Sequence, residues 1–314
     1  MSQSSAGPRE LAAHPTSASR VVDNTDWLKT AAIIFVSVDH FGHFFMENDR
    51  WWGAFGRLAA PIFFFLMGYA RTTTVPLRWV WLGVILTLLE SWNAEWTWVA
   101  PNILLSLALI RLAHPYAKIL VQRHGWVAFG FLVCLLVTTL PLAARCVDYG
   151  TEGWLWALFG LCQRQYVDGR SAAQAPGASC PGSIGEGNTA LKEDVFSMDA
   201  RVNSDLKPVR TDDRCSMTNA NQMRLLACVI AAVVYVWQEQ KEFSFPQLHF
   251  GVFVLGLAVL SVCLCVFRRG PSRIQLAEPV AGILRFIGRH TLEIYAVQLA
   301  GSELAIKLWP DLAP

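Results

Sequence analysis

Ionisable and amide side chains that interrupt otherwise apolar stretches are the first candidates for chemistry in this chain. Asp39 and His40 share one apolar stretch, while Arg57 and Asn102 each lie in another. An ionisable group inside a bilayer is costly, so each is a candidate for function. A histidine can exchange protons near neutral pH, and an arginine or amide can stabilise a developing negative charge. The residue types therefore indicate proton transfer coupled to stabilisation of an anion.

Their positions place these side chains at a common depth. His40 lies six residues from one end of its stretch, and Arg57 and Asn102 lie four residues from the corresponding ends of theirs. With a helical rise of about 1.5 Å per residue, all three sit roughly 6–9 Å below the same face. We predict one polar cavity open to that face, containing an Asp39–Arg57 ion pair. Asp39 and His40 point about 100° apart around a helix, so a general base at His40 needs a partner from another helix.

Other polar residues extend this prediction to a substrate and a co-substrate. His43 and Glu90 lie near the same face and are the candidates for contact with a substrate. At the opposite face, a helix that starts near several arginines can bind phosphate groups. The candidates for this co-substrate site are Arg268, Arg269, Arg289, His290 and Tyr295. The competing interpretations are a purely structural ion pair for Arg57 and ordinary membrane anchoring for the arginines.

Composition identifies the elements that must position these residues. The 314 residues are 54% hydrophobic and 16% charged, whereas soluble domains have about 25% charged residues. The apolar residues form blocks that approach the roughly 20 residues needed to cross a bilayer as a helix. We therefore predict an all-α, polytopic transmembrane bundle of about nine helices. The expected spans are 27–46, 53–70, 76–89, 98–113, 125–144, 153–166, 225–238, 248–267 and 290–308.

Charge separates the connecting segments into two sets. Arginine and lysine dominate alternate loops and acidic residues dominate the others, so the positive-inside rule places the basic loops and the N-terminus in the cytoplasm. The segment 167–223 is rich in Ser, Gly, Asp and Asn, and we predict a disordered cytoplasmic loop there. The expected organisation is a polar cytoplasmic segment 1–26, helices one to six in 27–166, the loop 167–223, helices seven to nine in 224–309 and a tail 310–314.

Several classes of protein are excluded by these features. The net charge of +2, without a basic patch interleaved with aromatics, argues against nucleic-acid binding. The eight cysteines show neither zinc-ligand spacing nor a disulfide framework, so we expect no metal and no permanently bound cofactor. The polar N-terminus lacks the apolar core of a signal peptide. The expected partner is the lipid bilayer.

Four sequence segments resemble TraX-type membrane proteins. The segments are DWLK at 26–29 leading into DHFG at 39–42, GRLAAPIF at 56–63, the asparagine at 102, and GRHTLEIY at 288–295. The last is similar to a pattern shared loosely with the wider transmembrane acyltransferases. In that wider group an arginine often stands where this chain has Lys29, and the last helix often carries a histidine, for which Gln298 is the nearest polar residue here.

The resemblance implies a multi-pass acyltransferase of a bacterial inner membrane. Such a protein would use acetyl-CoA or another acyl-CoA from the cytoplasmic side as co-substrate. The acceptor would be an amine or hydroxyl of an envelope molecule, such as a pilin-like protein or a glycan. His40 would be the general base, supported by Asp39, Arg57 and Asn102. A proton-coupled transporter or flippase and a non-catalytic membrane scaffold are the alternatives.

Overall fold

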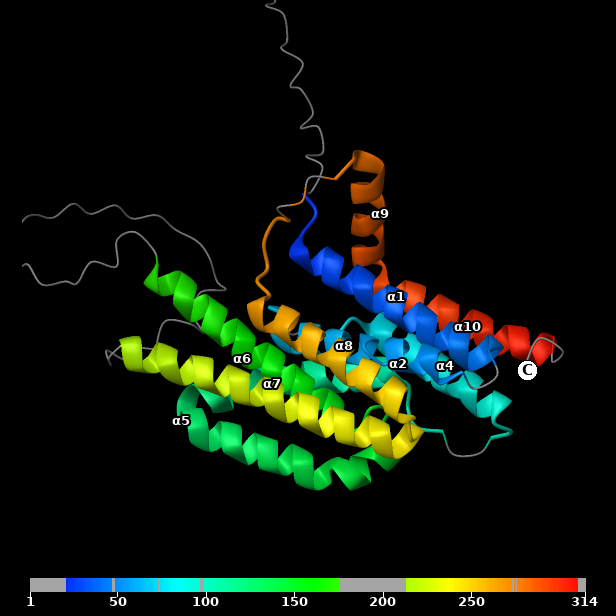
Figure 1. The fold of residues 1–314 in the computed structure, drawn as a ribbon, viewed down its shortest axis with the longest axis horizontal. Helices are drawn as coiled ribbons and strands as arrows, with labels where there is room; N and C mark the ends of the chain where they lie inside the picture. Colours follow the sequence, from blue (N-terminus) through cyan, green and yellow to red (C-terminus); the bar gives the residue numbers. More distant parts are fainter. Residues whose placement is uncertain are drawn as a thin grey trace, which may run out of the picture.

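The computed structural model describes an all-α molecule. It covers residues 21–46, 49–72, 74–96, 99–174, 213–272, 274 and 276–309, and the helices within these ranges run largely along one direction (Figure 1). The helices of the described residues are α1 (Asn24–Phe45), α2 (Arg50–Gly56), α3 (Ala59–Tyr69), α4 (Leu77–Asn93), α5 (Ile103–Cys146), α6 (Glu152–Ala173), α7 (Asp213–Phe243), α8 (Gln247–Val266), α9 (Glu278–Arg289) and α10 (Thr291–Leu308). The predicted helical class is confirmed.

The nine expected spans map onto these helices with three differences. The second span is divided into α2 and α3 by a break at Arg57 and Leu58. The fourth and fifth spans form the two arms of α5, which turns at Gly125 with φ 51° and ψ −123°. Positive φ is easily adopted only by glycine, which explains why the helix changes direction there. The third difference is α9, which we did not predict.

The expected loop 167–223 is shorter than predicted at both ends. Helix α6 continues to Ala173, and α7 already begins at Asp213. Residues 175–212, together with the N-terminal residues 1–20 and the tail 310–314, lie outside the described residues. The predictions of disorder for the loop and of a polar N-terminal segment therefore fall mostly on residues that the structure does not describe.

Helix α3 forms the centre of the molecule, and most of its residues are buried. Its partner α6 crosses it closely because small residues meet at the contact. A Cβ atom added to Gly68 would overlap the carbonyl oxygen of Ala157, and one added to Gly160 would overlap that of Phe65. Small residues at such crossings are typical of helix packing in membranes, where close approach of backbones supplies the packing energy.

The outer surface of the bundle is apolar. Large apolar side chains there are strongly exposed, including Val127 at 79%, Val297 at 73% and Leu255 at 66%. Soluble monomers rarely expose apolar patches of this extent. Three segments are long and apolar enough to cross a bilayer, namely Ile103–Ala143, Thr218–Phe243 and Gln247–Val266. The surface is therefore suited to lipid.

Candidate functional site

Arg57 lies at the break between α2 and α3, directly beside Asp39 of α1. The close approach depends on Gly56, because a Cβ atom there would overlap the Asp39 side chain. The Nε atom of Arg57 lies 3.7 Å from Asp39 Oδ1 and 3.8 Å from Glu239 Oε2. The predicted Asp39–Arg57 ion pair is thus present. Glu239 of α7 is a second partner that the sequence analysis missed.

Aromatic residues complete the surroundings of this guanidinium. Arg57 donates a hydrogen bond to the Tyr149 hydroxyl at 3.4 Å, and its guanidinium carbon lies 4.1 Å from the centre of the Phe243 ring. The hydroxyl of Tyr235 donates to the Arg57 carbonyl at 2.7 Å. A cation over an aromatic face is electrostatically favourable. Contacts from three different parts of the chain therefore fix the Arg57 charge in one place.

A cavity of about 370 Å³ opens beside Arg57. It is lined by polar and charged side chains from α1, α2 and the end of α7, including Asp39, His43, Arg50, Arg57 and Glu242. His43, a predicted substrate contact, is therefore part of this cavity. Both carboxylates and cations line it, so it suits an acceptor with a polar or charged group.

His40 belongs to a second cluster of polar residues, separate from the cluster around Arg57. Its ring centre is 5.5 Å from that of Tyr295 in α10 and 6.1 Å from that of Phe44. The Nδ1 atom is buried and has no hydrogen-bond partner among the described residues. A buried polar atom without a partner is uncommon and calls for an explanation, such as a ligand or a catalytic role.

Tyr295 connects His40 with Asn102. The amide of Asn102 donates to the Glu90 carboxylate at 2.8 Å and to the Tyr295 hydroxyl at 3.4 Å. Its carbonyl oxygen caps α5 by accepting from the Leu104 N–H at 3.2 Å. Glu90, predicted to contact a substrate, is therefore a hydrogen-bond partner of Asn102. Because Asn102 is both a helix cap and a hydrogen-bond donor to two side chains, its position is fixed.

The predicted single polar cavity does not contain all four of the residues expected to share it. Asp39 and His43 line the 370 Å³ cavity with Arg57, whereas the described lining of that cavity includes neither His40 nor Asn102. The reason is the helical offset between neighbouring residues, which directs Asp39 toward α2 and His40 toward α10. Two adjacent polar groups, joined by α1, replace the one chamber that we expected.

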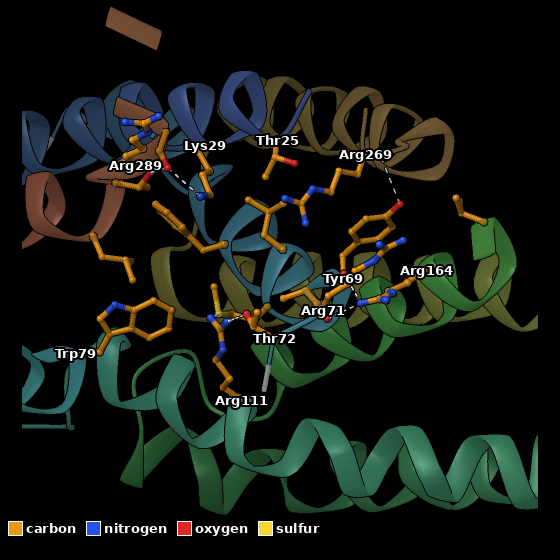
Figure 2. Close-up of a pocket in the computed structure, with 18 of the residues that line it drawn as sticks. Thr25, Lys29, Tyr69, Arg71, Thr72, Trp79, Arg111, Arg164, Arg269 and Arg289 are labelled. Carbon is orange, nitrogen blue, oxygen red and sulfur yellow. Dashed lines mark hydrogen bonds between the residues drawn. The ribbon is translucent and has the colours of Figure 1, made fainter. Parts of the chain in front are cut away.

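A larger and strongly basic cavity of about 530 Å³ lies near the start of α1. Figure 2 shows side chains from several helices turned toward it. Two carboxylates, Asp168 and Glu293, lie in its wall. The basic residues of the lining are Lys29, Arg71, Arg78, Arg111, Arg164, Arg269 and Arg289. Within the described lining, seven basic side chains against two carboxylates make this cavity suited to a polyanion.

Hydrogen bonds to backbone oxygens hold several of these cations. Lys29 donates to the Gly288 carbonyl at 2.8 Å, and Arg164 donates to the Ala70 carbonyl at 2.7 Å. Arg111 is 9% exposed, packs 4.9 Å from the Trp79 ring centre, and its Nε has no hydrogen-bond partner among the described residues. A buried guanidinium with an unsatisfied N–H is prepared to bind an anionic oxygen.

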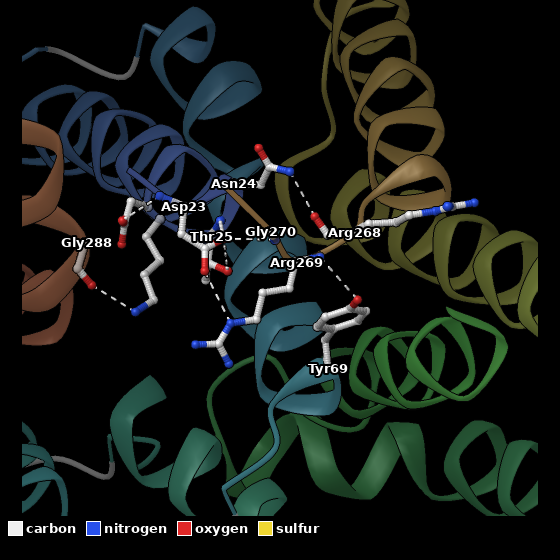
Figure 3. A network of polar contacts seen from close by, with 10 residues as sticks. Asp23, Asn24, Thr25, Tyr69, Arg268, Arg269, Gly270 and Gly288 are labelled. Atoms are coloured by element: carbon white, nitrogen blue, oxygen red, sulfur yellow. Dashed lines mark hydrogen bonds and ion pairs between the residues drawn. The ribbon is translucent and has the colours of Figure 1, made fainter. Parts of the chain in front are cut away.

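A polar network at the N-terminus of α1 positions Arg269 (Figure 3). Asp23 caps α1 and lies 3.2 Å from Arg269 Nε, while Arg269 N donates to the Tyr69 hydroxyl at 3.4 Å. Burial alone would raise the pKa of Asp23, but hydrogen bonds from Thr25, Arg269 and Gly270 hold that pKa below its ordinary value. The carboxylate is thus charged at neutral pH and keeps the segment after α8 against α1.

Only two of the five predicted phosphate-binding residues line the basic cavity. Arg269 and Arg289 line the basic cavity, whereas its described lining includes neither Arg268 nor His290 nor Tyr295. Tyr295 belongs instead to the group around His40.

Five other basic residues of the cavity were not assigned to a site by the sequence. They are Lys29, Arg71, Arg78, Arg111 and Arg164. Arg71, Arg78 and Arg111 entered the sequence analysis only as charges of the basic loops, and Lys29 only as part of the TraX-like segment 26–29. Arg164 lies near the end of the expected span 153–166.

Helix α1 joins the two ends of the candidate site. Lys29 lines the basic cavity and His40 lies eleven residues farther along the same helix. At 1.5 Å per residue this separation is about 16 Å. The molecule therefore presents a basic cavity at one depth and, at another, a cluster of polar residues around the half-buried His40.

Comparison with known proteins gives one match. Residues 24–174, which include α1 to α6 and just under half of the chain, match the family model described as TraX protein. No curated protein and no solved structure matches the chain. The matched region contains His40, Arg57 and Asn102, while Glu239 and Tyr295 lie beyond it.

Proposed function

We propose that this protein is a TraX-type membrane acyltransferase of a bacterial inner membrane, with several membrane-crossing helices. It transfers an acyl group, typically acetyl from acetyl-CoA, to an amine or hydroxyl of an envelope acceptor. One observation carries the proposal: α1 contributes Lys29 to a strongly basic cavity and, about 16 Å farther along, carries His40, whose buried Nδ1 has no hydrogen-bond partner among the described residues. This arrangement suits a donor that has phosphates at one end and a reactive thioester at the other.

The basic cavity is the proposed donor site. The phosphates of acyl-CoA would bind the arginines there, since a guanidinium matches phosphate oxygens with two parallel hydrogen bonds. Arg111 offers an unsatisfied N–H, and Arg289 and Arg269 are the two donor contacts that the sequence also predicts. The acyl end would then extend along α1 toward Tyr295.

The group around His40 is the proposed reaction centre. His40 takes the proton of the acceptor amine or hydroxyl while the acceptor atom bonds to the thioester carbon. Tyr295, whose hydroxyl the Asn102 amide positions, is a hydrogen-bond donor that can stabilise the oxyanion formed at the thioester oxygen. The carbon–sulfur bond then breaks, and the thiolate takes the proton from His40. Arg57 and Asp39 serve the cavity beside them, where they would hold the acceptor.

The first test of this function is a pair of histidine variants in purified protein. His40→Ala should remove acyl transfer from labelled acetyl-CoA to envelope acceptors and leave the thermal unfolding midpoint close to that of the wild type. The control is His124→Ala, because His124 is exposed and lies at the far end of the first arm of α5. Wild-type turnover in His40→Ala would contradict the proposal.

A second candidate function, proton-coupled transport, is favoured by two buried carboxyl groups, Glu152 of α6 and Glu239 of α7. Glu152 is 4% exposed and Glu239 is 1% exposed, and Oε2 of each has no hydrogen-bond partner among the described residues. Buried carboxyl groups of this kind form proton relays in transporters. Proton flux in proteoliposomes without consumption of acyl-CoA, lost in Glu152→Gln but kept in His40→Ala, would favour transport over transfer.

A further inference from the structure

Helix α9 differs from the other helices in direction. It stands across α1 and α10, near the end of the bundle where α1 begins (Figure 1). Its twelve residues are too few to cross a bilayer. Ala281, Leu284 and Gly288 form its buried side, and the first two pack with Val22 at the start of α1.

The remaining surface of α9 has two faces of opposite character. Successive residues turn by about 100°, so Glu278, Arg285 and Arg289 fall within about 40° of one another. The exposed apolar residues Val280, Ile283 and Phe286 centre about 140° away from them. These three are 46%, 59% and 59% exposed, so the bundle itself leaves this apolar face uncovered.

We propose that α9 is an interfacial helix whose Val280–Ile283–Phe286 face lies in the boundary between the lipid headgroups and the acyl chains. The proposal rests on the membrane placement of the bundle. A helix with opposed apolar and charged faces, lying across the membrane-crossing helices, matches the geometry of helices that lie in the membrane plane. Its charged face then points to water.

The charge around α9 identifies the membrane surface as the partner. Arg268, Arg269 and Arg289 are exposed at the same end of the molecule. Basic residues near a bilayer gain about 1 kcal/mol each from anionic lipids.

The position of α9 connects lipid contact with the basic cavity. The helix ends at Arg289, and α10 starts two residues later at Thr291, so both helices contribute to the cavity wall. Lys29 also donates to the carbonyl of Gly288 in the last turn of α9. Seating α9 on the membrane would therefore hold one wall of the cavity in place.

Cysteine labelling in lipid nanodiscs that hold one copy each tests this placement. Single cysteines are introduced by Ile283→Cys, Glu278→Cys and Val297→Cys in a protein whose eight native cysteines are all replaced by alanine. In discs of phosphatidylcholine with phosphatidylglycerol, a water-soluble, membrane-impermeant maleimide should label Glu278→Cys rapidly. We expect labelling of Ile283→Cys to be about tenfold slower and similar to that of Val297→Cys, because both positions face lipid.

The possible outcomes separate this inference from the proposed function. Equal rates for Ile283→Cys and Glu278→Cys, with Val297→Cys still protected, would overturn the interfacial placement of α9 while leaving the bundle in the membrane. Rapid labelling of all three would overturn the membrane placement as well. Neither result depends on catalysis, so inactivity toward acetyl-CoA would leave the inference intact.

Discussion

At the scale of single residues, Arg57 shows how much of a side chain's role is set by its neighbours. Its side chain is 20% exposed and is shared between Asp39, Glu239 and the Tyr149 hydroxyl. A lysine is a point charge and cannot span both carboxylates as the planar guanidinium does. The sequence predicted the ion pair with Asp39, because the two residues have matched depths. It could not show Glu239, which lies 182 positions away in α7.

Arg57→Gln should therefore destabilise the fold strongly. Removing one partner of a buried ion pair costs about 3–5 kcal/mol, because the remaining charges stay buried and uncompensated. The measurement is thermal or denaturant unfolding in detergent, with Arg123→Gln as control because Arg123 is exposed. Arg57→Lys should lie between Arg57→Gln and the wild type. Equal stability of all four proteins would show that the charge network contributes nothing.

The arginines of the basic cavity make a prediction of a different kind. Arg164→Ala should raise the KM for acyl-CoA about tenfold, equivalent to roughly 1.4 kcal/mol of binding free energy, with little change in kcat. The physical reason is the loss of a positioned cation far from the reacting atoms. Arg123→Ala is the matched control. An unchanged KM combined with a reduced kcat would place Arg164 outside the donor site.

At the scale of helices, the α3–α6 crossing depends on glycine. Gly68→Ala should lower the unfolding midpoint, because the new methyl group would overlap the Ala157 backbone. Gly130→Ala in α5 is the control, since a Cβ there meets no atom within 4 Å. That control should be neutral or stabilise by up to about 1 kcal/mol through helix propensity. Destabilisation by both substitutions to the same extent would remove the argument from close packing.

The helices also show what an apolar pattern can and cannot predict. Continuous apolar runs located α1, α4, α8 and α10 because burial and lipid contact require the same residue types. The pattern could not locate α9, whose apolar residues alternate with Glu278, Arg285 and Arg289. It also missed the break at Arg57, since a short interruption of hydrogen bonding leaves the composition of the span unchanged.

At the scale of the whole molecule, the candidate site depends on how helices far apart in sequence are arranged. The positive-inside rule separates basic from acidic loops but does not say which basic residues share a cavity. Arg111 of α5, Arg164 of α6 and Arg289 of α9 converge because α3 packs against α1, α5 and α6, and α1 in turn packs against α9. The common depth of Asp39, His40, Arg57 and Asn102 was predictable from the sequence. Only the structure shows that Asp39 faces Arg57 while His40 faces Tyr295 on another side of α1.

The last prediction concerns the segment between α6 and α7. The two helices pack along each other within the described residues, and Gln163 of α6 accepts a hydrogen bond from Arg224 of α7 at 2.8 Å. Replacing residues 175–212 by a flexible Gly/Ser linker of about 20 residues should leave this packing intact, because such a linker spans the ends without imposing a conformation. An acyltransferase should then keep most of its turnover in a labelled acetyl-CoA assay, with an unchanged unfolding midpoint.

The control for this replacement is the same linker in the inactive His40→Ala protein, which measures background labelling. A scaffold that recruits partners through residues 175–212 would behave in the opposite way, with loss of function in cells and no change in the folded membrane part. Loss of turnover in the purified protein, at an unchanged unfolding midpoint, would assign chemistry to this segment. The two cavities, whose described lining residues all lie outside 175–212, would then be insufficient for transfer.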